Sequence, residues 1–231
     1  MFMKTQIIED GFALVPDLAT ASEADNLLAA IEAAQGEPGA RHGSDGVYAM
    51  RNLLQVEVVR EWTQRVRVQQ LLGPILGDKY FPVRGILFDK TPGSNWKVGW
   101  HQDLSIAVQK RVDVPAFGPW SEKAGVTHVQ PPREVLETML TVRLHLDECG
   151  ENNGPLRVVP ASHLDGKLAP EAIQEMRRQN GQVICTLPRG GALLMRPLLL
   201  HASSPATSPH HRRIVHIEFA SQSLPGGLEW N

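Results

Sequence analysis

Three histidine–aspartate pairs, each with one residue between its members, are the part of this sequence best suited to chemistry. They are His101/Asp103, His145/Asp147 and His163/Asp165. On a β-strand, residues i and i+2 project from the same face, so both side chains of a pair can reach one metal ion. Two histidines and one carboxylate on one face of an octahedral Fe(II) leave three positions open for other ligands. Spacing alone does not choose among the pairs, because a polar sheet face, a turn or a buried histidine would also explain them.

A third ligand and a cation are available near the end of the chain. His201 ends an apolar run and is followed by a loop rich in Pro, Ser and His, after which a new strand begins with Arg212 and Arg213. If the two strands are hairpin neighbours, His201 lies close to one of these arginines. A guanidinium binds a carboxylate through two charge-assisted hydrogen bonds, which a lysine does not reproduce. This combination suits a metal-chelating dicarboxylate such as 2-oxoglutarate, although both arginines could instead be solvated.

The elements that would position these residues are mostly short strands. Seven extended runs are bounded by Gly, Pro, Asn or Ser: 80–90, 96–108, 139–147, 156–160, 182–187, 191–195 and 212–220. This pattern predicts an antiparallel sandwich or jelly roll, the double-stranded β-helix. The first third of the chain predicts a helical cover. One helix starts at Thr20, which has capping-box spacing to Glu23, and a second helical stretch covers 56–76 with an interruption near Gly73 and Pro74.

The run 139–147 alternates between apolar and polar residues. Its apolar face consists of Leu140, Val142, Leu144 and Leu146, and its polar face consists of Thr141, Arg143, His145 and Asp147. Side chains of a strand alternate between the two faces of the sheet. The polar face is therefore either the solvated side of a sheet or the interior of a barrel that holds a polar ligand.

Composition narrows the possible partners. The 23 Lys and Arg residues nearly balance 25 Asp and Glu residues, so no basic excess favours nucleic acid or an anionic membrane surface. No apolar run approaches the roughly 20 residues that span a bilayer, and the N-terminus does not read as a secretory signal. Two cysteines are too few for an all-cysteine zinc site.

We expect a cytoplasmic protein without an evident protein partner, folded as one domain over 1–231. Its helical part covers about 18–76 and its jelly-roll core about 79–221.

Several motifs in the same order resemble the phytanoyl-CoA dioxygenase family of Fe(II)/2-oxoglutarate oxygenases. The resemblance extends from about Ile7 to Phe219. The motifs are 87–96 (LFDKTPGSNW), 100–103 (WHQD), 144–147 (LHLD), 153–156 (NGPL), 159–163 (VPASH), 190–195 (GGALLM) and 201–205 (HASSP), followed by Arg212.

This resemblance implies a set of site residues. It selects His101, Asp103 and His201 as the iron ligands and leaves the other two His-x-Asp pairs in structural roles. It favours Arg212 over Arg213, because the family places an arginine eleven positions after the last histidine. The remaining contacts to 2-oxoglutarate that it implies are Gln102, Arg143 and Ser203.

The resemblance also implies a reaction, to which two other hypotheses are alternatives. Fe(II), 2-oxoglutarate and O2 would together oxidise a C–H bond of a small-molecule substrate, with release of succinate and CO2. Halogenating relatives carry a small residue in place of the carboxylate ligand, so Asp103 favours hydroxylation. The alternatives are a cupin-like metal-dependent isomerase or lyase and a non-catalytic binding protein on the same fold. The segment 106–130 is a candidate substrate lid, and Arg51 corresponds to a basic residue that points into the site in relatives.

Overall fold

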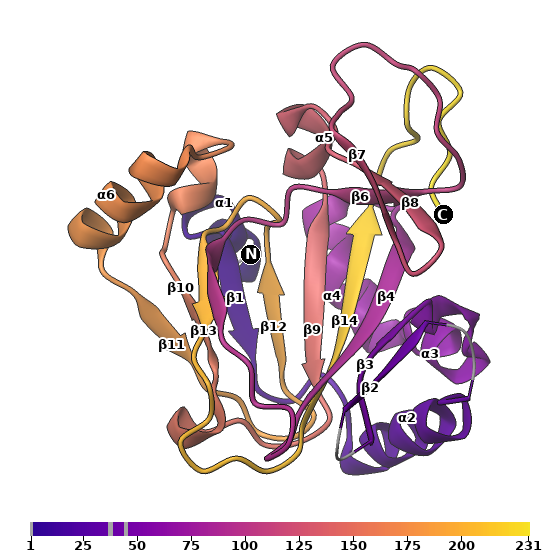
Figure 1. The fold of residues 1–231 in the computed structure, drawn as a ribbon, viewed down its shortest axis with the longest axis vertical. Coiled ribbons are helices and arrows are strands. Elements are labelled where there is room, and N and C mark those ends of the chain that lie inside the picture. The colour runs from indigo at the N-terminus through magenta and orange to yellow at the C-terminus, as the bar shows by residue number, and fades with distance from the viewer. Residues whose placement is uncertain (1, 37–38, 44–45) are drawn as a thin grey trace.

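Antiparallel sheets dominate the computed structural model, which describes residues 2–36, 39–43 and 46–231 (Figure 1). The largest sheet has seven strands in the order β1 (Phe12–Val15), β12 (Ala192–Met195), β9 (Leu140–His145), β14 (Arg212–Ala220), β4 (Phe81–Lys90), β3 (Gly46–Arg51) and β2 (Ala40–Gly43). A four-stranded sheet has the order β11 (Val183–Cys185), β10 (Leu156–Val158), β13 (His201–Ser203) and β5 (Val98–His101). The predicted fold class, a mainly β jelly roll with flanking helices, is confirmed.

Helices cover the outer face of the seven-stranded sheet. They are α1 (Phe2–Glu9), α2 (Ala21–Ala33), α3 (Glu57–Trp62) and α4 (Val66–Leu76). The apolar face predicted for 139–147 packs in one core with them, since its four leucine and valine residues are buried together with Leu27, Ile31, Trp62 and Leu72. The predicted capping box is also present: the Glu23 backbone N–H donates to Thr20 Oγ1 over 3.2 Å, and the Thr20 backbone N–H donates to Glu23 Oε2 over 2.8 Å.

The opposite face of the seven-stranded sheet packs toward the four-stranded sheet and carries polar side chains, among them Arg143 and His145. Part of the space between the sheets is apolar, because Leu193, Met195, Leu156 and Val158 pack in a second buried cluster. The remainder is lined by side chains of β4, β9 and β14 on one side and of β5 and β13 on the other. Thr141, Arg143 and His145 therefore face the interior, the second of the two alternatives that the sequence left open. Asp147 lies beyond the end of β9 and pairs with Arg213 instead.

Several predicted boundaries were wrong. The second helical stretch breaks at 63–65, where the Thr63 hydroxyl donates to the Arg60 carbonyl over 2.6 Å, whereas Pro74 lies inside α4. The run 96–108 is two strands, β5 and β6 (Ile106–Val108), because the chain leaves the four-stranded sheet after His101. The part predicted as a helical cover, about 18–76, also contains β2 and β3, which join the main sheet. Short helices also separate some strands: α5 (Arg133–Glu137), α6 (Pro170–Asn180), η1 (Leu53–Gln55), η2 (Glu151–Asn153) and η3 (Ser162–Asp165).

The segment 106–130, a candidate lid loop in the sequence, is folded into a small sheet of its own. Its strands β6, β8 (Val126–Val129) and β7 (Trp120–Lys123) pair in that order. Ile106, Val108 and Val129 are fully buried in a third apolar cluster. Turn residues in the segment concealed these strands, and the buried face anchors the segment to the rest of the molecule.

Candidate metal centre

The four-stranded sheet brings two of the histidines together. His101 of β5 and His201 of β13 are paired residues in the antiparallel ladder, and their ring centroids are 4.2 Å apart. Asp103 lies two residues beyond β5, where its backbone N–H donates to the Pro197 carbonyl over 2.9 Å. Its carboxylate oxygens lie 3.8 Å from His101 Nε2 and 3.7 Å from His201 Nε2. One donor atom from each of the three residues lies within 4.8 Å of the others.

Both imidazole rings are oriented so that one nitrogen is free to bind a metal. His101 Nδ1 is 2.9 Å from the Gly99 carbonyl, and His201 Nδ1 is 2.8 Å from the Leu199 carbonyl. A carbonyl oxygen accepts from an N–H, so each ring carries its proton on Nδ1 and presents the lone pair of Nε2. Burial lowers the pKa of His201 to about 4, which keeps this ring neutral at pH 7.

Asp103 supplies the charge of the site. Burial alone would raise the pKa of this carboxyl, but the neighbouring His201, His216 and His101 rings hold it below its usual value. Asp103 Oδ2 is buried and has no hydrogen-bond partner among the described residues. Burying a carboxylate oxygen without a hydrogen-bond partner costs free energy unless a bound cation compensates its charge. Two Nε2 lone pairs and one carboxylate form the donor set that octahedral Fe(II) accepts on one face, so the residues fit the metal.

The other two His-x-Asp pairs lie elsewhere. His145 is buried in β9, and Asp147 forms an ion pair with Arg213, with 2.7 Å between Asp147 Oδ1 and Arg213 Nη2. His163 and Asp165 lie in the short helix η3, and His163 Nε2 is 3.2 Å from the Ile8 carbonyl. Among the described residues, only the trio of His101, Asp103 and His201 forms a cluster of potential metal donors.

A cavity of about 230 Å³ adjoins the three donors. Its wall includes Arg143, Ser203 and Arg212, three of the four residues expected to contact 2-oxoglutarate. Neither guanidinium is fully paired, since the buried Nε atoms of Arg143 and Arg212 have no hydrogen-bond partner among the described residues. Arg212 also donates from Nη1 to the Gly154 carbonyl, which holds the guanidinium in place. These features suit a carboxylate bound deep in the cavity.

Gln102 is not part of this wall. Its amide Nε2 donates to the Gly166 and Leu198 carbonyls over 2.7 and 2.6 Å, and its Oε1 accepts from the Leu168 backbone N–H over 2.8 Å. All three partners are backbone groups. The side chain therefore connects the metal-binding loop to two other loops, and it does not line the cavity with its sequence neighbours His101 and Asp103.

The sequence reasoning missed two polar residues that line the cavity, Arg84 and His216, and two that bond to lining residues, Glu218 and Lys90. Arg84 of β4 donates to Glu218 of β14, and His216 is 3.2 Å from the same Glu218 oxygen and 2.7 Å from Arg143 Nη1. Lys90 donates to Ser203 Oγ over 3.1 Å and to the Ser204 carbonyl over 2.7 Å. The sequence pattern could have revealed part of this set. In the strand 212–220, residues 212, 216 and 218 are polar and lie even numbers of positions apart, so their side chains project from the same face.

Comparison with known proteins agrees with the fold. The family model for phytanoyl-CoA dioxygenase (PhyH) matches residues 7–214. No curated protein sequence is significantly similar to this chain. Among solved structures, EctD from S. alaskensis in its apoform has a TM-score of 0.73 and 19% identity over 94% of this chain and 75% of that chain.

Two further structures are similar. AviO1 from Streptomyces viridochromogenes Tue57 has a TM-score of 0.67 and 22% identity over 97% of this chain and 96% of that chain. SnoK, a non-heme alpha ketoglutarate dependent carbocyclase from nogalamycin biosynthesis, has a TM-score of 0.71 and 15% identity over 96% and 84% of the two chains. The TM-scores establish a shared fold, and identities this low show nothing beyond the fold.

The chain belongs to the phytanoyl-CoA dioxygenase family. The membership predicted from the sequence is thereby confirmed, and with it the family's cofactor set of Fe(II), 2-oxoglutarate and O2. Within the described ranges, no helix is long and apolar enough to cross a membrane.

Proposed function

We propose that this chain is a dioxygenase that hydroxylates a C–H bond of a small-molecule substrate and converts 2-oxoglutarate to succinate and CO2. The observation that carries the proposal is the convergence of His101 Nε2, His201 Nε2 and the Asp103 carboxylate beside a cavity lined by Arg143 and Arg212. We place the whole reaction in one domain over 1–231. When bound, the iron supplies the oxidising chemistry together with 2-oxoglutarate and O2.

The residues of the chain have distinct parts in this proposal. His101, Asp103 and His201 would hold the metal beside the cavity, and three protein ligands would leave room for others. Arg212 binds the distal carboxylate of 2-oxoglutarate, with Ser203 and Arg143 beside it. Ser203 itself is oriented by Lys90, which donates to its hydroxyl. Burial and the nearby Arg212 lower the pKa of Lys90 to about 7, so this amine is only partly charged near neutral pH.

Asp103 bears on the type of reaction. A carboxylate in the ligand set occupies the position that a halide would need, so hydroxylation or a related C–H oxidation is favoured over halogenation. A second candidate outcome is ring closure, because SnoK, which has the same fold, is a carbocyclase. Hydroxylation and ring closure differ in the product: hydroxylation adds one oxygen atom to the substrate, whereas oxidative ring closure removes two hydrogen atoms.

The proposal also has non-redox rivals on the same fold, a metal-dependent isomerase or lyase and a binding protein without catalysis. Melting temperatures distinguish them under anaerobic conditions with Fe(II) alone, 2-oxoglutarate alone and both together. We expect the pair to raise the melting temperature more than the sum of the two separate shifts, since the metal and Arg212 bind the same molecule. Additive shifts would contradict the proposal. Succinate release during incubation with metabolite extracts and O2 then identifies substrates.

A further inference from the structure

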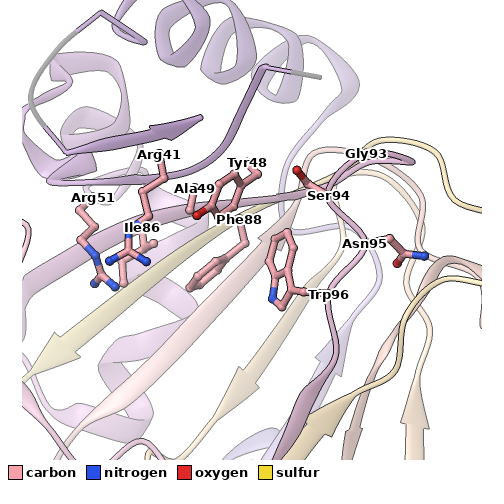
Figure 2. A pocket seen from close by; sticks show the side chains of 10 residues that line it. All are labelled: Arg41, Tyr48, Ala49, Arg51, Ile86, Phe88, Gly93, Ser94, Asn95 and Trp96. Carbon is pink, nitrogen blue, oxygen red and sulfur yellow. The ribbon is translucent and has the colours of Figure 1, made fainter. Parts of the chain in front are cut away.

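A second, larger cavity of about 600 Å³ opens next to the metal cavity (Figure 2). The two cavities share three lining residues, Ile86, Phe88 and Trp96, and are therefore neighbouring chambers. The smaller chamber holds the candidate metal ligands and Arg212, whereas the larger one contains none of them. A substrate that reaches the metal from outside would occupy this outer chamber.

Two arginines enter the outer chamber from the edge of the seven-stranded sheet. Arg41 of β2 pairs with Ala49 of β3, which in turn pairs with Phe88 of β4. Arg51 of β3 pairs with Ile86 of β4. Paired residues project from the same face of a sheet, so both arginines lie on the face that carries the cavity. Residues related diagonally across two strands are near neighbours, and Figure 2 shows both guanidinium groups on one side of the chamber.

Neither of these two guanidinium groups has a counter-ion among the residues that the structure describes. Within the described part of the chain, neither Arg41 nor Arg51 has a side-chain hydrogen bond or an ion pair, whereas the neighbouring Arg84 is bound to Glu218. Arg51 is half-buried, and burial together with the nearby Arg41 and Arg84 lowers its pKa. Glu218 is the acid that acts against this shift, and it already has Arg84 and His216 as partners.

Arg41 is exposed and Arg51 is half-buried, and two like charges side by side are unfavourable unless an anion joins them. An arginine that merely covers a surface would extend into water or pair with an exposed acid, as Arg67 does with Asp17. Arg41 and Arg51 instead line a concave space. Their planar donors match the oxygens of a carboxylate, a phosphate or a sulfate.

The rest of the chamber is aromatic. The Tyr48 and Trp96 rings meet edge to face with 5.6 Å between centroids, and Phe88 lies on the wall shared with the metal cavity. Aromatic walls bury flat or apolar groups, and the two arginines provide charge at one end only. The chamber thus separates a charged end from an apolar body, with the shared wall leading toward His101.

We propose that Arg41 and Arg51 form an anion-binding subsite for the substrate, which is a small molecule with an anionic group at one end and a flat or apolar body. The anion binds between the two guanidinium groups, the body lies against Tyr48 and Trp96, and the group to be oxidised extends past Phe88 toward the metal. The oxidation step rests on the function proposed above. Anion binding does not, since it needs neither iron nor 2-oxoglutarate.

Isothermal titration calorimetry on the iron-free protein tests the subsite. The probes are phenylacetate and phenyl phosphate, which separate carboxylate from phosphate recognition, and phenylacetamide, which is the neutral isostere of phenylacetate. We expect at least one anionic probe to bind roughly tenfold or more tightly than the amide, because hydrogen bonds to charged groups are stronger than neutral ones. Arg41→Gln and Arg51→Gln should each remove most of this preference. Arg67→Gln, which removes the same charge from an exposed position, should leave it unchanged.

Three results would overturn the subsite. The first is equal binding of charged and neutral probes to the wild type, and the second is an unchanged preference for the anionic probe in both Arg41→Gln and Arg51→Gln. The third is loss of that preference in Arg212→Lys instead, which would place the anion in the inner cavity. A separate assay of succinate release pairs each candidate acid with its amide. Charge-selective binding without any succinate release would contradict the proposed dioxygenase while leaving the anion subsite standing.

Discussion

Arg212 and Arg213 are consecutive residues of β14, yet their guanidinium groups lie on opposite faces of the sheet. Arg212 is buried on the wall of the metal cavity, whereas Arg213 binds Asp147 through Nη2 and Nε over 2.7 and 2.8 Å and lies 3.3 Å from Glu32 of α2. The alternation of a strand therefore gives one arginine to the ligand cavity and the other to the attachment of a helix.

This difference predicts that Arg212→Lys weakens 2-oxoglutarate binding. Lysine keeps the positive charge but loses the planar pair of donors, so we expect affinity to fall roughly ten- to a hundredfold while iron affinity changes little. Arg213→Lys is the matched control and should retain cosubstrate affinity. Anaerobic calorimetric titration of 2-oxoglutarate into the Fe(II) protein measures both variants. A large loss confined to the position 213 variant would reverse the assignment.

The metal ligands give a second prediction. His101→Ala, Asp103→Ala and His201→Ala should each weaken iron binding by roughly a hundredfold or more, since loss of a residue that only orients a ligand already costs 10–100-fold. The strands stay paired without the ion, so far-UV circular dichroism should not change. His163→Ala and His145→Ala are controls that should keep the metal, measured as iron content after gel filtration. Equal iron loss in His163→Ala would show that the wrong pair had been chosen.

Gln102 provides a third prediction, because its side chain bonds to three backbone groups instead of lining the cavity. Gln102→Leu should lower the free energy of unfolding by about 2–4 kcal/mol, at roughly 1 kcal/mol for each hydrogen bond. With iron held at saturation, 2-oxoglutarate affinity should change less than about threefold, a small effect beside that of Arg212→Lys. Urea denaturation and cosubstrate titration measure the two effects. A stable variant with strongly weakened cosubstrate binding would instead support the contact that the sequence implied.

The buried His145 gives a pH prediction. Burial, together with Arg143 and Arg212, lowers the pKa of His145 from 6.5 to about 3. Between these two values the unfolded chain binds a proton that the folded chain does not, so this residue makes stability fall as the pH falls below 6.5. His145→Gln should therefore reduce the stability lost between about pH 6 and about pH 5 by about 1 kcal/mol.

Urea denaturation of the iron-free protein at the two pH values measures this difference. His42→Gln changes an exposed histidine of β2 and should leave the pH dependence unaltered. If the His145→Gln protein lost as much stability on acidification as the wild type, the ring would not be a neutral buried group.

The features of the fold that depend on local sequence patterns could be predicted from the sequence. The alternation in 139–147 predicted both faces of β9, and the spacing from Thr20 to Glu23 predicted the start of α2, because each depends on neighbours within a few residues. Placing His201 opposite His101 also needed the family resemblance, since 100 residues separate them and spacing alone allowed three pairs.

Other features depend on tertiary contacts that no local pattern records. The direction of Gln102 depends on loops at 166–168 and 198, far from it in sequence. The position of Arg41 depends on two successive strand pairings at the sheet edge, and the strands β2 and β3 lie in a stretch that the sequence pattern assigned to the helical cover. Turn residues likewise concealed the strands of 106–130.

The most direct test of the central claim, that one metal at His101, Asp103 and His201 binds 2-oxoglutarate, is an anaerobic absorption titration. Iron(II) is added to the wild-type protein first and 2-oxoglutarate second, and the metal-to-ligand charge-transfer band is recorded. We predict a saturable visible band in the wild type and none in His201→Ala. Absence of the band in wild-type protein that demonstrably holds iron would contradict the account and favour a metal-dependent isomerase or lyase.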